Sequence, residues 1–195
     1  MDAWEERYQR GETGWDRGGV SPALLHWLES GELQPCRLLV PGCGRGYEIV
    51  ELAKRGFAVT AIDIAPSAVA FLQQRLDEAD LTATVICADL FTYQPEQLFD
   101  AVYEQTCLCA IQPAARVAYE QRLYSWLREG GMLFALFMQT GVSGGPPFHC
   151  DVTHMQALFH AKRWQWPPCE AMTVPHHGGK FELGHKIVKR CTDRP

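Results

Sequence analysis

The sequence predicts an α/β fold built on a mostly parallel sheet, with helices on both faces and an antiparallel hairpin at one edge. Short apolar runs alternate with longer amphipathic segments through most of the 195 residues, and this alternation is typical of βαβ units. The last two runs alternate polar and apolar residues with no helix between them, which indicates an antiparallel pair. The chain length fits one domain, and we expect residues 1–195 to form it.

Seven segments have the pattern of strands, so we expect a seven-stranded sheet. The strands are Arg37–Val40, Phe57–Ile62, Thr82–Cys87, Phe99–Glu104, Met132–Met138, Trp164–Thr173 and Phe181–Lys189. The connecting helices are expected at Gly46–Arg55, Ser67–Ala79, Ala114–Leu127 and Val152–Phe159. Their boundaries carry the usual signals: Pro66 suits a first helical turn, Asp151 an N-cap, and Gly130-Gly131 a helix end.

The composition argues against several classes of protein. The net charge is −5 and no basic stripe is visible, so we expect no nucleic-acid partner. No apolar run is long enough for a membrane span, and the polar, aromatic first residues do not resemble a signal peptide. We therefore expect a cytoplasmic protein with no membrane partner, acting on a small molecule as a monomer or weak homodimer.

The eight cysteines indicate thiols in a reducing compartment. They are scattered, often inside apolar runs, and no C-x-x-C occurs, so a disulfide framework is not expected. A group with His149, Cys150, His154 and His160 could suggest zinc, but its spacing fits no paired zinc motif. We expect no metal.

A glycine-rich turn follows the first strand. Gly42, Gly44 and Gly46 alternate there and lead into a helix, and only glycine lets a backbone turn so tightly and approach a ligand closely. The amides at the start of that helix face whatever binds. The second strand ends in Asp63, where a carboxylate can accept hydrogen bonds from both hydroxyls of a ribose. These features predict an adenosine-containing cofactor.

The spacing of the glycines indicates which cofactor. Dinucleotide folds need a third glycine at the position that Tyr47 occupies here. The G-x-G-x-G spacing, with Asp63 after strand two and Asp89 after strand three to hold the adenine amine, resembles the S-adenosylmethionine site of Rossmann-like methyltransferases. The alternatives are an ordinary βα turn with two capping aspartates, or a nicotinamide-dependent oxidoreductase.

The N-terminal segment, residues 1–30, is unusually aromatic. Trp4 and Tyr8 lie four residues apart, so a helix would present both on one face, and Trp15 and Trp27 follow. The segment could be a helix packed on the core. It could also be a lid, because aromatic faces attract cations and a sulfonium is a cation.

Several motifs together resemble the thiopurine S-methyltransferase family, which includes thiol, thiocyanate and halide methyltransferases. The resemblance runs through most of the chain. It rests on the segments 4–8, 11–16, 40–46, 99–113, 145–148 and 181–184, with Arg116 at the family spacing.

The resemblance implies a set of site residues. The implied cofactor contacts are Trp4, Tyr8, Trp15, Gly42, Gly44, Asp63, Asp89, Leu90, Phe91, Glu104 and Gln105. Arg116 is implied as the catalytic, acceptor-side residue, where a guanidinium would hold an anion. Two departures matter: Tyr8 stands where plant relatives usually have tryptophan, and Glu104-Gln105-Thr106 stands where they usually have Asp-Tyr-Thr.

We therefore expect a class I methyltransferase that transfers a methyl group from S-adenosylmethionine to a small soft nucleophile, foremost a thiol, and releases S-adenosylhomocysteine. Halide, thiocyanate, tellurite and selenite are alternative acceptors. A non-catalytic cofactor-binding sensor is a further alternative. Cys107 and Cys109 are expected to be small buried side chains, because the reaction needs no covalent enzyme intermediate.

Overall fold

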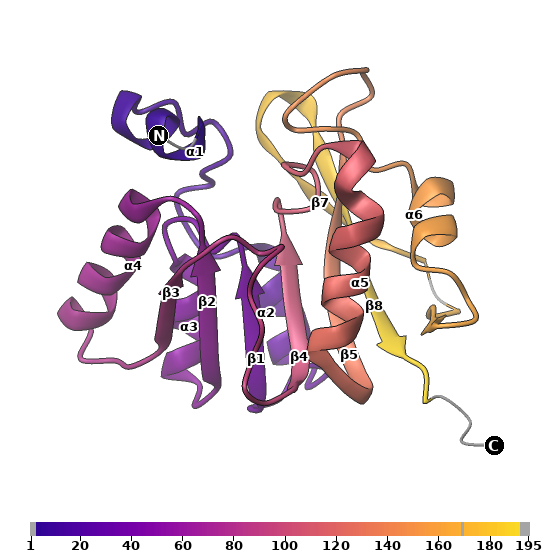
Figure 1. The fold of residues 1–195 in the computed structure, drawn as a ribbon, viewed down its shortest axis with the longest axis horizontal. Coiled ribbons are helices and arrows are strands. Elements are labelled where there is room, and N and C mark those ends of the chain that lie inside the picture. The colour runs from indigo at the N-terminus through magenta and orange to yellow at the C-terminus, as the bar shows by residue number, and fades with distance from the viewer. Residues whose placement is uncertain (1–2, 169, 192–195) are drawn as a thin grey trace. The chain divides into compact units, whose positions relative to one another are not determined.

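The computed structural model describes residues 3–168 and 170–191, which fold as two compact units (Figure 1). Unit 1 spans Met1–Tyr93 and unit 2 spans Gln94–Pro195. Strands alternate with helices in both, most strands are parallel, and an antiparallel edge ends the chain, so the predicted fold class is confirmed. The organisation of residues 1–195 as one domain stays a prediction.

Unit 1 contains three parallel strands in the order β3-β2-β1. They are β1 (Arg37–Pro41), β2 (Ala58–Asp63) and β3 (Thr84–Cys87). The register pairs Pro41 with Ile62 and Asp63 with Cys87. The carboxyl ends of all three strands therefore meet at one edge, where ligands bind in open α/β sheets.

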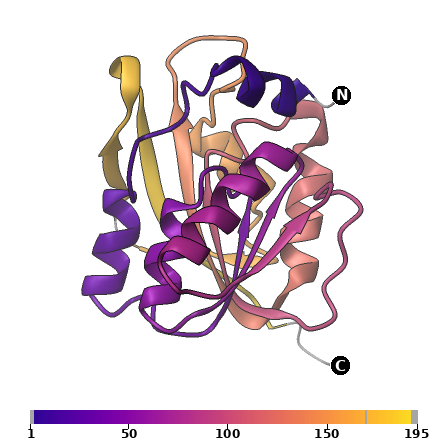
Figure 2. The same ribbon diagram turned by 90° about the vertical axis from the view of Figure 1, so that its left-hand side faces the viewer.

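Four helices surround these strands: α1 (Ala3–Arg10), α2 (Pro22–Glu29), α3 (Tyr47–Lys54) and α4 (Pro66–Glu78). Helix α2 was not predicted, although Ser21 and Pro22 carry its signals: the Ser21 hydroxyl accepts the amide of Ala23, and Pro22 opens the helix. α3 and α4 pack against β2 and each other, and α1 lies where α4 begins (Figure 2).

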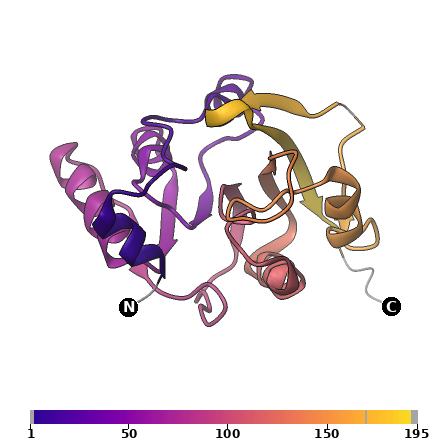
Figure 3. The ribbon, with the colours of Figure 1, turned by 90° about the horizontal axis from the view of Figure 1, so that it is seen from above.

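The described residues of unit 2, 94–168 and 170–191, form five strands and two α-helices. The strands are β4 (Phe99–Gln105), β5 (Leu127–Gln139), β6 (Trp164–Gln165), β7 (Met172–Pro175) and β8 (Phe181–Lys189). β4 and β5 are parallel, and β8 runs antiparallel to β5, β6 and β7. The helices are α5 (Arg116–Trp126), preceded by a 3-10 turn at Pro113–Ala115, and α6 (Val152–Leu158), which packs on α5 (Figure 3).

The strand predicted over residues 164–173 is wrong in one respect: the structure has the separate strands β6 and β7 there, which makes eight strands among the described residues instead of seven. Pro167 and Pro168 lie between the two strands, and proline has no N–H to donate to a ladder. Cys169 falls outside the described residues. A 3-10 turn at His177–Gly179 connects β7 to β8.

The end of α5 also differs from the prediction. The helix stops at Trp126, and Gly130-Gly131 lie within β5, at the point where its register with β4 shifts. Leu127 is fully buried and pairs with Phe99, so packing in the sheet outweighs the tendency to continue the helix. A Cβ at Gly131 would lie 2.8 Å from the carbonyl oxygen of Arg128, which explains the glycine there as part of a bulge.

One glycine of the turn allows a direct test of the packing in unit 1. Gly46 has φ of +76°, and a Cβ there would lie 2.3 Å from Cδ1 and 3.1 Å from Cβ of Leu72 on α4. Gly56 has φ of +83° with no atom within 4 Å of such a Cβ, which makes it a matched control for the backbone strain alone.

We predict that Gly56→Ala lowers the free energy of unfolding by about 1–2 kcal/mol, the strain of a left-handed alanine. Gly46→Ala should lower it by roughly a further 1–3 kcal/mol, because Leu72 must also shift. Chemical denaturation of both variants measures the difference. Equal losses would show that α4 does not press on the turn.

Candidate functional site

The carboxylate of Asp63 joins the ends of two strands in unit 1. Its Oδ2 accepts the amide of Gly44 at 2.9 Å, and its Oδ1 accepts the amide of Ala65 at 3.0 Å. A backbone bond from Cys43 to Ile62 runs beside them at 3.0 Å. The glycine-rich turn after β1 is therefore held against the end of β2, as the sequence predicts.

The turn has the shape that a bound adenosine needs. Gly42 and Gly44 have φ of +60° and +54°, conformations that side-chain-bearing residues rarely adopt. A Cβ added at Gly44 would lie 3.4 Å from the Tyr8 hydroxyl, so its absence keeps the turn open toward that ring. A carboxylate can accept about four hydrogen bonds, so Asp63 can serve ribose hydroxyls as well as the backbone.

Aromatic side chains from the N-terminal segment meet beside this turn. Trp15 makes edge-to-face contacts with both Trp4 and Tyr8, each with ring centroids 5.4 Å apart. Burial, and then the charge of Asp63, raise the pKa of the Tyr8 hydroxyl. The structure thus brings together Trp4, Tyr8, Trp15, Gly44 and Asp63.

Glu5, which the sequence analysis missed, fixes α1 to α4. Its carboxylate accepts the amide of Ser67 at 2.9 Å and the Ser67 hydroxyl at 2.7 Å. No side chain of its own segment caps α4, because Ala65 stands at the N-cap. The two hydrogen bonds from Ser67 lower the pKa of Glu5, so the carboxylate caps a helix from another part of the chain.

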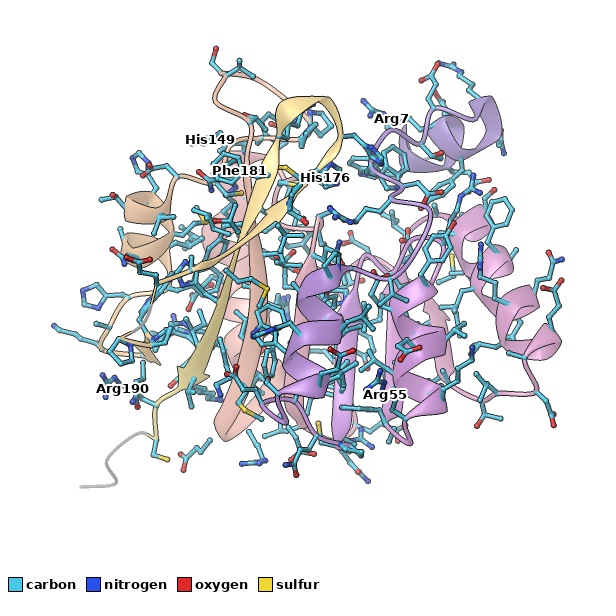
Figure 4. All side chains as sticks on the ribbon, turned by 180° about the vertical axis from the view of Figure 1, so that it is seen from behind. Arg7, Arg55, His149, His176, Phe181 and Arg190 are labelled. Atoms are coloured by element: carbon cyan, nitrogen blue, oxygen red, sulfur yellow. The ribbon has the colours of Figure 1, made fainter. Side chains whose placement is uncertain are left out.

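A second tie holds the residues that follow α1. Arg45, within the glycine-rich turn, pairs with Asp16 at 3.0 Å, and its guanidinium lies 4.9 Å from the ring centroid of Phe71. Figure 4 shows Arg7 and Arg55 at opposite ends of unit 1, with Arg7 at the end where α1 lies. The N-terminal segment is therefore docked on the turn and on α4.

Asp89, Leu90 and Phe91 form a turn just beyond β3. The exposed carboxylate of Asp89 accepts the amide of Phe91 at 2.8 Å, and its carbonyl accepts the amides of Thr92 and Tyr93. Asp89 stabilises the backbone of this turn.

The end of β4 in unit 2 carries a buried carboxyl group. Glu104 is 1% exposed, and its Oε1 accepts the amide of Leu108 at 2.5 Å. Burial raises the pKa of Glu104 to about 7, although the Leu108 amide and the charge of Arg116 oppose the rise. The next residue, Gln105, accepts a hydrogen bond from the Tyr103 hydroxyl at 2.8 Å.

Arg116, at the first position of α5, binds the far end of the loop that follows β5. Its guanidinium donates to the carbonyl of His149 at 3.1 Å, to the carbonyl of Phe148 at 3.4 Å and to Sγ of Cys150 at 3.3 Å. Arg116 is 8% exposed, so it is not a surface arginine. The structure places it in contact with the glycine- and proline-rich loop, a role that its sequence position alone did not indicate.

The loop itself, residues 140–149, is closed by its own histidine. Nδ1 of His149 accepts the amides of Thr140 at 3.0 Å and Gly141 at 3.4 Å, and the amide of Phe148 donates to the carbonyl of Cys109 at 2.7 Å. In Figure 4, His149 and Phe181 both lie toward the end of unit 2 that carries the turn between β7 and β8. Residues 141–145 are exposed, whereas Cys150 is buried.

The sequence also predicts no metal site and no membrane-spanning helix, and the structure bears on both only within residues 3–168 and 170–191. No group of three or more histidines, cysteines, aspartates and glutamates could hold a metal ion there. No helix in these ranges is both long and apolar enough to cross a membrane. Cys107, Cys109 and Cys150 are buried, and burial raises the pKa of the Cys109 and Cys150 thiols.

Comparison with known proteins gives consistent matches. The family model for thiopurine S-methyltransferase matches residues 1–183. Thiocyanate methyltransferase 1 of Arabidopsis thaliana is 33% identical over 186 residues, with 93% of this chain and 82% of the relative covered. Thiopurine S-methyltransferase of Xanthomonas axonopodis pv. citri (strain 306) is 34% identical over 199 residues, with 91% and 89% covered.

A solved structure has the same fold. The 1,6-didemethyltoxoflavin-N1-methyltransferase of Burkholderia thailandensis, with 1,6-didemethyltoxoflavin and S-adenosylhomocysteine bound, superposes with a TM-score of 0.75 at 22% identity. The superposition covers 96% of this chain and 86% of that one.

We predict that Glu5→Gln loosens the N-terminal segment. The glutamine side chain has no negative charge to interact with the N-terminus of α4, and it has only one oxygen to accept the two hydrogen bonds from Ser67. Tryptic cleavage after Arg7 and Arg10 should become severalfold faster, and S-adenosylhomocysteine should slow it again. Glu6→Gln is the control, since Glu6 makes only an exposed pair with Arg10 at 3.6 Å. Equal cleavage rates for both variants would contradict the docking role of Glu5.

The buried carboxyl group gives a prediction about pH. A pKa raised from 4.5 to about 7 means that the folded state binds the Glu104 proton more tightly than the unfolded state does, by about 3 kcal/mol. This contribution is complete below the unfolded pKa and is lost as pH rises through about 7. Glu104→Gln, which mimics the protonated form, should therefore gain stability relative to the unmodified chain between about pH 5 and pH 8. Denaturation at several pH values measures this difference, and a constant difference would contradict the raised pKa.

Proposed function

Because this chain belongs to the thiopurine S-methyltransferase family, we propose that it transfers the methyl group of S-adenosylmethionine to a small soft nucleophile, foremost a thiolate. The methyl transfer would leave S-adenosylhomocysteine. The bound sulfonium supplies the electrophilic carbon, so the chain has to position the two reactants and exclude water.

The observation that carries this proposal is the hydrogen bond from Gly44 to Asp63, next to the aromatic rings of Tyr8 and Trp15. The carboxylate would accept the ribose hydroxyls, and Gly42 and Gly44 would leave space for the rest of the adenosyl group. The rings of Trp4, Tyr8 and Trp15 would shield the sulfonium, whose charge aromatic faces attract.

The other cofactor residues are proposed from their positions at strand ends. Asp89, Leu90 and Phe91 follow β3, where the adenine ring would be held. Glu104 and Gln105 end β4, and we assign them to the cofactor's side of the reaction centre. All five residues are thus assigned to S-adenosylmethionine.

Arg116 is proposed as the catalytic residue on the acceptor side. Its contacts with the carbonyls of Phe148 and His149 support a double role, since the same guanidinium would set the loop position and attract an anionic acceptor. Replacing it should therefore disturb the acceptor more than the cofactor.

Thiocyanate is the second candidate acceptor. A relative named thiocyanate methyltransferase is 33% identical to this chain, and thiocyanate is a soft anion like a thiolate. Halide, tellurite and selenite remain lesser alternatives. We also infer a cytoplasmic enzyme that acts as a monomer or weak homodimer, without a nucleic-acid or membrane partner.

The test is an assay of labelled methyl transfer from S-adenosylmethionine to a panel of thiols, thiocyanate, iodide, tellurite and selenite. We expect S-adenosylhomocysteine to appear with at least one thiol.

Asp63→Asn should bind the cofactor at least about tenfold more weakly, since a charge-assisted hydrogen bond is worth about 1.5–3 kcal/mol. Lack of transfer to every acceptor by the unmodified chain would contradict the proposal, as would unchanged cofactor affinity in a folded Asp63→Asn variant.

A further inference from the structure

Oε2 of Glu104 and Nε of Arg116 are among the buried polar atoms of unit 2 for which the described residues offer no hydrogen-bond partner. Unsatisfied groups of this kind are uncommon in folded proteins, and each one calls for an explanation such as a bound molecule or a catalytic role. The two residues are close enough for the positive charge of Arg116 to lower the pKa of Glu104, against the larger effect of burial. Together they leave one acceptor and one donor unused.

The backbone beside Glu104 is also unusual. Thr106, two residues on, has φ of +58°, although β-branched residues strongly avoid the left-handed region. Strain of this kind tends to collect at active sites, where the surrounding structure enforces it. The position of the carboxyl group is therefore imposed by the fold.

Several titratable groups around Glu104 are already protonated at neutral pH, so they cannot take the proton of an acceptor thiol. Those within its electrostatic influence are Arg116 and Tyr119 of α5, Cys109 after β4, and Cys150 after β5. Burial raises the pKa of Tyr119, Cys109 and Cys150, so all three stay protonated. The buried carboxyl group of Glu182 on β8 also acts electrostatically on the Cys109 thiol.

We propose that Glu104 is the general base that removes the proton from a thiol acceptor, while Arg116 holds the resulting thiolate. This inference rests on the proposed function and specifies how thiols enter the reaction. The S–H bond breaks and its proton moves to Oε2 of Glu104. The sulfur then forms the new S–C bond as the C–S bond of the sulfonium breaks, and Glu104 finally releases the proton to water.

The proton step decides which acceptors need Glu104. A simple alkyl thiol has a pKa of about 8.5, so only a few per cent is thiolate at pH 7. A general base works best when its pKa lies near the operating pH. Thiocyanate, iodide and a nitro-substituted aromatic thiol are already anions, so none of them needs a base to remove a proton.

The loop segment Phe148–Cys150 contacts the same guanidinium that would hold the thiolate. Arg116 holds its two carbonyls, while residues 141–145 are exposed and rich in glycine. The acceptor would reach the carboxyl group when this segment moves aside, and the unused Nε of Arg116 would donate to the thiolate.

The experiment compares Glu104→Gln with the unmodified chain on two thiols at pH 7, an alkyl thiol and a nitrothiophenol that is already ionised. We expect kcat/KM for the alkyl thiol to fall about a hundredfold, the usual scale of general base catalysis. For the ionised thiol and for thiocyanate it should fall at least about tenfold less, because any loss through the cofactor is common to all acceptors and only the alkyl thiol also loses its base. The deficit on the alkyl thiol should shrink as pH rises toward its own pKa.

Glu120→Gln is the matched control, because Glu120 is also a buried carboxylate of unit 2. It accepts hydrogen bonds from Trp164 at 2.5 Å and Arg163 at 3.0 Å and has no proposed role in the reaction. This variant should treat both thiols alike. A carboxyl-carbon NMR titration of the unmodified chain gives a readout that depends neither on turnover nor on the folding of a variant: one glutamate should titrate near neutrality, and adding the alkyl thiol with S-adenosylhomocysteine should shift its resonance.

Equal losses on both thiols in Glu104→Gln would overturn the inference and leave the proposed function standing, because Glu104 would then serve only the cofactor or the fold and would not act as a base. The lack of a carboxyl group that titrates near neutrality would also overturn it. An unmodified chain that methylates no acceptor would instead refute the proposed function, and this inference with it.

Discussion

The hydrogen bond from the Gly44 amide to the Asp63 carboxylate is the interaction on which the site in unit 1 depends. It joins the end of β1 to the end of β2 and fixes a turn that only glycine can adopt easily. Asp63 reaches Ala65, just before α4, with its other oxygen, and Glu5 then caps α4 from α1. The aromatic N-terminal segment is thereby fixed to the same few atoms that would hold a ribose.

Unit 2 depends on a different constraint, the burial of ionisable groups. Glu104 is nearly inaccessible and retains an unused oxygen, whereas a purely structural site would satisfy both oxygens or replace the residue with an apolar one. The fold therefore tolerates a destabilising carboxylate above neutral pH. Such stability–function conflicts are expected at reaction centres and are much less common elsewhere.

The sequence predicted features that local spacing determines. The glycine turn, Asp63 at the end of β2, the Asp151 cap of α6 and Arg116 at the start of α5 all lie where spacing places them. Features that depend on distant partners were not predictable. Nothing near Glu5 indicates that its partner is Ser67, 62 positions away, and nothing near Arg116 indicates the carbonyls of Phe148 and His149. The Gly130-Gly131 pair looked like a helix end because a bulge uses the same residue type.

The most direct test of this account is to follow backbone amide resonances while S-adenosylhomocysteine is added. The amides of Gly44 and Ala65 donate to Asp63 and that of Ser67 donates to Glu5, so binding should shift all three, together with the indole N–H of Trp15. Gly56, which lies in the turn before β2 at the opposite end of that strand, should stay unchanged. Shifts confined to other parts of the chain, or no saturable shift at Gly44, would contradict the assignment of the cofactor site.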